Sequence, residues 1–139
     1  MSTDEFILID GDGLDTAAAY RLLIGCVVPR PIAWITTVDA QGRVNAAPFS
    51  SYNYVATSRP MFAVNIAARA DAIKDTARDI RETGEFVVNV ATEASMELMH
   101  ACGAEYARDI SEAKVMAGAM KSPAPPAGKG TIKRIGLSG

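Results

Sequence analysis

The chain of 139 residues has few of the residue types that bind metals or form nucleophile–base pairs. It contains two cysteines, Cys26 and Cys102, without CxxC spacing, and a single histidine, His100. Zinc and dithiol motifs are therefore excluded, and both thiols are expected to be reduced and packed. Residues i and i+2 do not face each other on a helix, so His100 and Cys102 are not predicted to form a nucleophilic pair. The GxGxxG, GxxxxGKS/T and GxSxG motifs of phosphate-binding loops and hydrolases are also absent.

Positive charge is scarce over most of the chain. Met1–Ala113 has 9 basic and 16 acidic residues, whereas Lys114–Gly139 has five basic residues and no acidic one. An acidic main body argues against duplex nucleic-acid binding, which needs a basic face. No apolar run reaches the roughly 18 to 20 residues that span a bilayer, and the N-terminus lacks the basic start of a signal peptide. We therefore expect a cytoplasmic protein with small-molecule substrates and with neither a nucleic-acid nor a membrane partner.

Apolar residues are numerous enough for one domain with a moderate core. Hydrophobic residues make up 49% of the chain, and 24 residues are alanine. Elements rich in alanine must pack closely or leave surface for a partner chain or a flat ligand. Runs of β-branched and aromatic residues predict strands, which cover 6–9, 32–38, 43–47, 60–67 and 85–91. In the last two strands bulky residues alternate with small or polar ones, so each has one bulky face and one face with an asparagine.

Turn and helix signals separate these strands. Asp39–Gly42 predicts the tight turn of a hairpin. Three helices are predicted, from Asp15 or Thr16 to Ile24 with Gly25 as the stop, from Asp75 or Thr76 as the N-cap to Gly84, and from Thr92 through His100 with Met96 and Met99 inward. Strand pairs with short helices between them, and without repeated β-α-β alternation, predict an α+β fold with an antiparallel, barrel-like sheet and peripheral helices.

The composition changes near residue 114. The last part of the chain is rich in proline, glycine, alanine and lysine, as in the stretch from Lys121 to Gly130. Such a segment cannot bury enough apolar surface to offset the entropy lost on ordering. We therefore predict a folded domain over 1–113 and a disordered tail over 114–139.

A polar cluster follows the predicted strand at 43–47. Residues 45–54 combine hydroxyl, amide and aromatic side chains. Ala47 and Pro48 would admit a flat ring, and Ser50 and Ser51 are hydrogen-bond donors suited to a phosphate. A flavin or a nucleotide would fit this stretch, and the alternative is an ordinary polar loop that ends a strand.

A second cluster precedes the predicted helix at 75–84. Arg69 and Lys74 bring positive charge to a helix start, whose free amides attract anions, and the Thr76 hydroxyl is a further donor. This combination predicts a phosphate site. The alternative is a helix capped by Asp75, with Lys74 and Arg78 solvated.

The third cluster surrounds Trp34, the only tryptophan. Strand alternation puts Ile32, Trp34 and Thr36 on one face, which favours a core or interface tryptophan over one that stacks on a ligand ring. Arg30 lies between two prolines and is the better ligand candidate.

Five stretches within Leu14–Glu112 follow one another in a familiar order and spacing; they are Tyr20–Gly25, Val28–Thr37, Asn45–Tyr52, Lys74–Thr76 and Glu85–Asn89. Together they resemble the flavin reductase-like family of FMN-binding split barrels. The resemblance implies a six-stranded split barrel, usually a homodimer, with FMN near the subunit interface.

The resemblance also implies a set of FMN-binding residues. The isoalloxazine ring and ribityl chain would contact Arg30, Pro31, Ile32, Ala33, Trp34, Asn45, Ala47, Pro48 and Phe49. The phosphate would be held by Ser50 or Ser51, with Arg69, Lys74 and Thr76. No metal and no catalytic side chain is implied, because hydride transfer from NAD(P)H is the chemistry of the flavin itself. The reduced flavin would serve an acceptor such as a partner monooxygenase.

The chain departs from this family after Glu112. Family members are usually longer and continue into further strands, whereas Lys114–Gly139 is proline-rich and basic. A truncated or frameshifted reading frame would explain the change, and a divergent natural tail is the alternative. The expected barrel therefore lacks its C-terminal strands and has an open edge. The alternative function is a non-catalytic FMN-binding or remnant protein.

Overall fold

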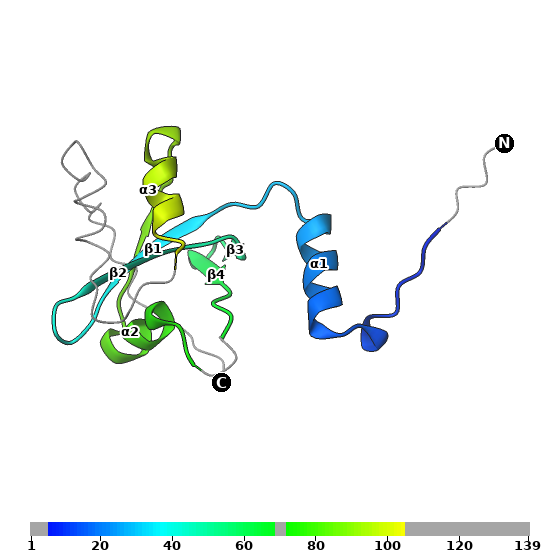
Figure 1. Ribbon diagram of the computed structural model, residues 1–139, viewed down its shortest axis with the longest axis horizontal. Coiled ribbons are helices and arrows are strands. Elements are labelled where there is room, and N and C mark those ends of the chain that lie inside the picture. Colours follow the sequence, from blue (N-terminus) through cyan, green and yellow to red (C-terminus); the bar gives the residue numbers. More distant parts are fainter. Residues whose placement is uncertain (1–5, 69–71, 105–139) are drawn as a thin grey trace. The chain divides into compact units, whose positions relative to one another are not determined.

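The computed structural model describes residues 6–68 and 72–104 (Figure 1). The chain divides into two compact units, Met1–Arg30 and Pro31–Gly139. The first unit contains the short helix η1 (Gly11–Gly13) and α1 (Thr16–Cys26). The elements of the second unit are β1 (Ala33–Val38), β2 (Val44–Phe49), β3 (Tyr52–Ala56), β4 (Met61–Val64), α2 (Asp75–Thr83), β5 (Val87–Asn89), η2 (Glu93–Ser95) and α3 (Met96–Ala101). None of the helices in the described ranges is long and apolar enough to cross a membrane.

Helix α1 begins where the sequence predicts and ends later. The Asp15 side chain accepts a hydrogen bond from the Ala18 amide at 2.6 Å, which is an N-cap. The prediction that Gly25 stops the helix is wrong, because the Val27 amide still donates to the Leu23 carbonyl at 3.2 Å. The chain leaves the helix before Pro29, which cannot continue it.

Two other predictions for the first unit are wrong. Residues 6–9 do not form a strand, and no described strand pairs with them to satisfy their backbone groups. Cys26 is exposed rather than packed, whereas Cys102 in the second unit is buried as expected.

The second unit is built on a three-stranded antiparallel sheet with the order β2-β1-β5. The predicted hairpin joins β1 to β2: the Asp39 amide donates to the Arg43 carbonyl at 3.0 Å, and Gly42 adopts a φ of +77°. β2 extends through Pro48 to Phe49, beyond the predicted end at residue 47. A proline without an amide proton is tolerated there because β2 is an edge among the described strands.

A two-stranded antiparallel sheet, β3–β4, follows β2. The sequence predicted no strand at β3, because this segment reads as a polar loop. Tyr52 nevertheless pairs with Val64, and Tyr54 pairs with Phe62. The described strands are therefore all antiparallel and occur with short helices, which confirms the α+β class and the antiparallel sheet.

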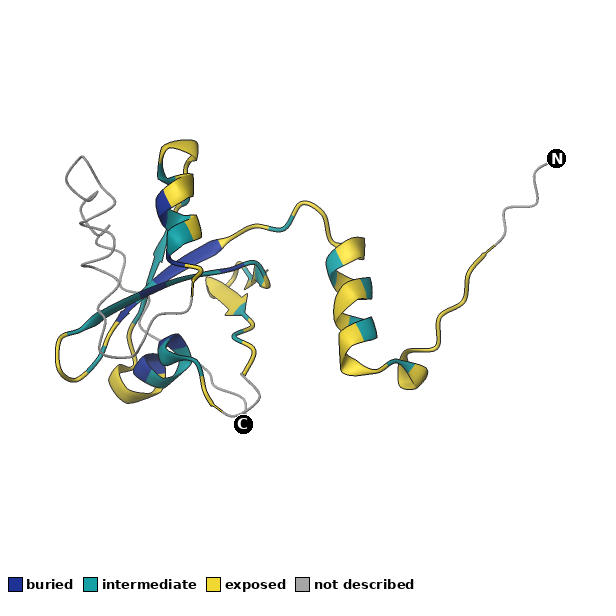
Figure 2. Cartoon of the chain, in the orientation of Figure 1, coloured by how far each residue is buried: buried dark blue, intermediate teal, exposed yellow. Residues whose placement is uncertain are grey.

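The two faces of β1 are both covered. Trp34 packs with Ala46, Leu98 and Cys102 on the face that contacts α3. Ile35 points the other way and forms a second cluster with Ala33 and Phe49, against which six partly buried side chains pack: Ala47, Tyr52, Val64, Ile66, Phe86 and Val88. Figures 1 and 2 show α2 and α3 on opposite sides of β1 and β2, with the buried residues between them. β1 is therefore a central strand.

The ends of the predicted sheet strands differ from the structure. β4 and β5 are shorter than 60–67 and 85–91. The predicted bulky faces are only partly covered, since Phe62 is 47% exposed and Val90 is 85% exposed. Val90 follows the last paired residue of β5, so no neighbouring strand fixes its side chain against the core.

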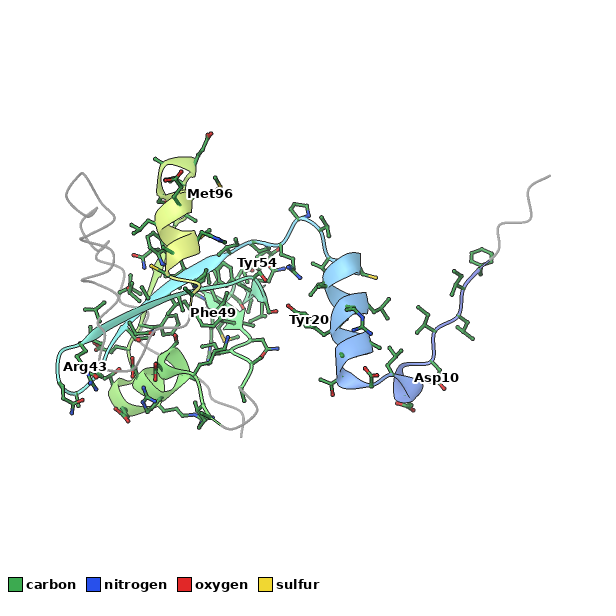
Figure 3. The ribbon with its side chains drawn as sticks, viewed as in Figure 1. Asp10, Tyr20, Arg43, Phe49, Tyr54 and Met96 are labelled. Carbon is green, nitrogen blue, oxygen red and sulfur yellow. The ribbon has the colours of Figure 1, made fainter. Side chains whose placement is uncertain are left out.

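Helix α3 presents a different face to the core from the predicted one. Met96 was expected to point inward but is 56% exposed, whereas Leu98 is 8% exposed (Figure 3). The Thr92 and Ser95 side chains form a capping box over the short helix η2, and α3 then begins at Met96. This start rotates the inward face from Met96 to Leu98, while Met99 packs against the core as predicted.

Candidate functional site

The fold brings residues of all three predicted clusters together. In the β1–β2 pairing, Ala33 lies opposite Phe49. The Lys74 ammonium lies 5.6 Å from the centroid of the Phe49 ring, which is marked in Figure 3. The Asn45 side-chain amide donates to the Thr76 hydroxyl at 2.8 Å. The start of β1, the end of β2 and the start of α2 therefore meet in one region.

The predicted ligand residues on β1 and β2 divide between the two sheet faces. The alternation of the strands puts Ala33, Asn45, Ala47 and Phe49 on the face that contacts α2. Trp34 and its partner Pro48 point to the α3 face, where Trp34 is 3% exposed. The expectation that Trp34 is a core residue is therefore confirmed.

The remaining predicted site residues lie next to these strands in the sequence. Pro31 and Ile32 are exposed just before β1, and Arg30 is the last residue of the first unit and is half-buried. Ser50 is half-buried and Ser51 is exposed, in the link between β2 and β3. The Ser51 carbonyl accepts a hydrogen bond from the Asn65 amide at 2.9 Å. Arg69 lies outside the described residues.

The start of α2 has no side-chain cap within residues 6–68 and 72–104. Lys74 occupies the N-cap position, and no side chain of these residues accepts a hydrogen bond from the amides of the first turn. The prediction that Asp75 caps the helix is wrong, because its carboxylate pairs with the Arg78 guanidinium instead. The first-turn amides therefore have no side-chain acceptor in the described part of the chain, and they lie next to the positive Lys74. We call Lys74 and the amides of residues 75–77 the candidate anion site.

Behind this site lies a group of hydrogen-bonded side chains that we call the polar cluster: Thr37, Asn45, Thr76 and Asp79. The Thr37 hydroxyl donates to the Asp79 carboxylate at 2.7 Å, and the Asn45 amide donates to the Thr37 hydroxyl at 3.2 Å. The same Asn45 amide donates to Thr76. Thr37, Thr76 and Asp79 are each 2% exposed. The polar cluster thus joins β1 and β2 to the inner face of α2.

Sequence reasoning missed Thr37 and Asp79 as part of this region. A signal for Asp79 was present, because Thr76, Asp79 and Ile80 share one face of a helix at spacings of three and four residues. Thr37 carries no comparable signal, since a threonine in a strand is ordinary.

Burial raises the pKa of Asp79 above its ordinary value of 3.8, and the hydrogen bond from Thr37 and the charge of Arg78 oppose the rise only in part. Within the described ranges its Oδ1 atom has no hydrogen-bond partner. The nearest cation contact to that atom, Arg78 Nη2, is 3.8 Å away. Ionised Asp79 is therefore a costly group in this fold.

The raised pKa of Asp79 predicts a pH dependence of stability. The folded state holds the Asp79 proton more tightly than the unfolded chain does. Its contribution to stability is therefore fully present below pH 3.8 and is lost as the pH rises through the folded pKa. We expect Asp79→Asn, which cannot ionise, to gain stability relative to the native chain across that window. Urea unfolding at a series of pH values measures this difference, and a pH-independent difference would contradict the expectation.

Asp39 is a control, because its pKa shift, and so the effect of pH on its contribution to stability, has the opposite sign to that of Asp79. Burial acts to raise its pKa, but hydrogen bonds from Arg43 and Gln41 outweigh this effect and lower the pKa below 3.8. The Asp39 contribution is therefore present above pH 3.8 and lost as the pH falls through its folded pKa. The stability of Asp39→Asn relative to the native chain should accordingly fall as the pH rises.

Comparison with known proteins identifies the family. The model of the flavin reductase-like domain matches residues 24–130, and the chain belongs to this family. Its fold is the flavin reductase-like split barrel, with the described antiparallel sheets and helices as part of it.

Solved structures agree with this assignment. Nitrilotriacetate monooxygenase component B from Bacillus cereus is 31% identical, with a TM-score of 0.76, over 83% of this chain and 57% of that chain. The 2-nitrobenzoate 2-nitroreductase NbaA of Pseudomonas fluorescens is 37% identical, with a TM-score of 0.65, over 79% of this chain and 52% of that chain. A split barrel domain structure from Shewanella frigidimarina, 23% identical with a TM-score of 0.60 over 75% of this chain and 50% of that chain, shares the fold.

The chain spans about half the length of the curated relatives that it matches. It covers 51% and 54% of two bacterial proteins with which it is 43% and 39% identical.

Proposed function

We propose that this chain binds FMN and acts as a flavin reductase-like oxidoreductase that transfers hydride from NAD(P)H to the flavin. The observation that carries the proposal is the candidate anion site, where an uncapped helix start and the Lys74 ammonium lie beside the paired ends of β1 and β2. Membership of the flavin reductase-like family supports a flavin-dependent reaction. The names of two similar structures, a monooxygenase component and a nitroreductase, support redox chemistry.

The residues present fit a phosphate monoester. Free helix amides, a lysine ammonium and the hydroxyls of Ser50 and Ser51 are all donors to phosphate oxygen. Pairing of Asp75 with Arg78 neutralises the carboxylate that would otherwise repel an anion at this helix start. The Thr76 hydroxyl is buried in the polar cluster, so Thr76 would contribute its backbone amide rather than its side chain.

The chain's own residues would bind and orient the cofactor. Bound FMN would supply hydride acceptance from a reduced nicotinamide and onward electron transfer to an acceptor. Pro31 and Ile32, exposed just before β1, would be the accessible contacts for the flat ring, because Ala33 and Phe49 are already buried against neighbouring side chains. Lys74 and the first turn of α2 would hold the phosphate end and so fix the ring along the sheet.

A partner monooxygenase and a homodimer are the assemblies that we propose. One structural neighbour is itself a monooxygenase component B, which supports an oxygenase as acceptor. The β3–β4 sheet exposes large apolar side chains, namely Tyr54, Val55, Met61 and Phe62, at 47% to 66%. An apolar group of this kind suits contact with a second copy of the chain.

Binding of FMN and of riboflavin tests the phosphate assignment. We expect FMN to bind more tightly, because riboflavin lacks the phosphate. Lys74→Ala should weaken FMN binding by about 1.5–3 kcal/mol, or about 10- to 150-fold, and leave riboflavin binding unchanged. Fluorescence titration of the full chain measures both affinities.

Arg81→Ala is the matched control for Lys74→Ala. Arg81 is an exposed cation on the last turn of the same helix, so its removal changes the net charge equally. It should leave both affinities unchanged. Equal affinities of the native chain for FMN and riboflavin would refute the phosphate assignment.

The second candidate function is a non-catalytic FMN-binding protein, for which the candidate anion site would serve equally well. Steady-state oxidation of NADH and of NADPH with added FMN separates the two functions. Turnover supports the reductase, and FMN binding without turnover supports the binding protein.

A further inference from the structure

We propose that Asp79 is a positioning residue, which acts through the polar cluster to hold the start of α2 in place for the phosphate end of the flavin. This inference rests on the proposed function, because it assigns a task within the same site. Asp79 itself would not touch the ligand.

Asp79 sets which groups donate and which accept in the polar cluster. A carboxylate only accepts, so the Thr37 proton is directed to Asp79. The Thr37 oxygen is then free to accept, and the Asn45 amide nitrogen donates to it. The same nitrogen donates to Thr76. Asp79 thereby fixes which way the Asn45 amide points, and Asn45 in turn fixes Thr76.

Through Thr76, these hydrogen bonds hold the start of α2 against β2. Thr76 is the second residue of α2, and its hydroxyl is held against β2 by Asn45. Lys74 lies two residues earlier, over the ring of Phe49 on the same strand. The start of α2 therefore contacts β2 at two points of the candidate anion site, Lys74 and Thr76, and the contact through Thr76 is the buried one.

The α2 helix has little apolar surface with which to hold itself in this position. Among its residues only Ile80 is a buried apolar side chain, while Thr76 and Asp79 are the other buried ones. Apolar contacts are non-directional and would tolerate rotation or sliding of a nine-residue helix. Hydrogen bonds of fixed length and direction do not tolerate such movement.

The test compares Thr37→Val with Thr83→Val. Thr37→Val removes the hydroxyl that links Asp79 to Asn45 and keeps the shape of the side chain. Thr83→Val removes a hydroxyl from the same helix at its other end, where Thr83 donates to the Asp79 carbonyl at 2.8 Å. We expect Thr37→Val to weaken FMN binding by about 5- to 50-fold, while riboflavin binding changes less than about twofold. Thr83→Val should leave the ratio of the two affinities unchanged.

Two variants of Asp79 complete the comparison. Asp79→Asn keeps an oxygen that accepts from Thr37, and its FMN affinity should stay within about threefold of the native value. Asp79→Ala removes the acceptor and should behave as Thr37→Val does. Equal losses of FMN and riboflavin affinity in Thr37→Val and Asp79→Ala would mean a general structural role and would overturn the inference.

Failure of the inference and failure of the proposed function give different results. If Lys74→Ala abolishes the preference for FMN and Thr37→Val does not, the phosphate assignment stands and the inference is overturned. If the native chain shows no preference for FMN, the proposed phosphate assignment fails.

If the native chain shows no preference for FMN, hydrogen exchange of the unliganded chain tests whether the polar cluster holds the start of α2. The Arg78 amide donates to the Lys74 carbonyl at 3.1 Å and reports the first turn. The inference requires its exchange to be about tenfold faster in Thr37→Val than in Thr83→Val. Equal rates in the two variants would overturn it.

Discussion

Trp34→Ala should lower the free energy of unfolding by about 3–5 kcal/mol, one of the two largest effects that we expect in this chain. Trp34 is 3% exposed and lies in the centre of the cluster between β1 and α3. Its removal leaves a cavity that Ala46, Leu98 and Cys102 cannot close, because strand pairing fixes the backbone beside it. Urea unfolding followed by far-UV circular dichroism measures the loss.

Trp34→Phe is the control for this substitution. The Trp34 Nε1 atom is buried and has no hydrogen-bond partner in the described part of the chain. Phenylalanine keeps most of the apolar volume and removes this polar atom, so its cost should stay below about 1.5 kcal/mol. If the two variants lost equal stability, the cavity explanation would be wrong.

Ile35→Ala should cost about 2–5 kcal/mol on the opposite face of the same strand. Ile35 is 1% exposed and packs with Ala33 and Phe49 under the β3–β4 sheet. Because Phe49 also lies under Lys74, this loss of packing should weaken FMN binding as well. Chemical unfolding gives the stability change, and fluorescence titration gives the change in affinity.

Two milder substitutions set the scale for Ile35→Ala. Ile35→Val removes one methylene and should cost about 0.5–1.5 kcal/mol. Val38→Ala lies on the same strand at a position that is 47% exposed, and it should change stability by no more than about 0.5 kcal/mol. Similar losses of stability in Ile35→Ala and Val38→Ala would show that the packing of Ile35 with Ala33 and Phe49 does not stabilise the fold.

The N-cap was predicted correctly for α1 but not for α2. Asp15 caps α1 as its pattern predicts, since its carboxylate accepts a hydrogen bond from the Ala18 amide. Asp75 has the same pattern but pairs with Arg78, three residues later on the same helix. Among the described residues no side chain then caps this helix start, which lies next to Lys74. A competing ion pair on one helix turn therefore decides whether Asp75 acts as a cap.

The predicted ligand residues point to different faces of the sheet, which the sequence patterns did not predict. Sequence order identified the stretches that contain them, but it could not say which residues point the same way. The β1–β2 register put Trp34 and Pro48 on one face and Ala33 and Phe49 on the other. The packing of α2 against β2 placed the Thr76 hydroxyl in the polar cluster, where it accepts from Asn45.

Local patterns of residues are enough to predict the α+β class, the hairpin at Asp39–Gly42, the family and the stretches around the site. The folded chain was needed to show that β1 is covered on both faces, that β3 is a strand, and that Thr37 and Asp79 lie behind the candidate anion site. These features depend on partners distant in the chain, such as the Thr37–Asp79 hydrogen bond across 42 residues. Local propensity carries no information about such a partner until the strands pair and the helix packs on them.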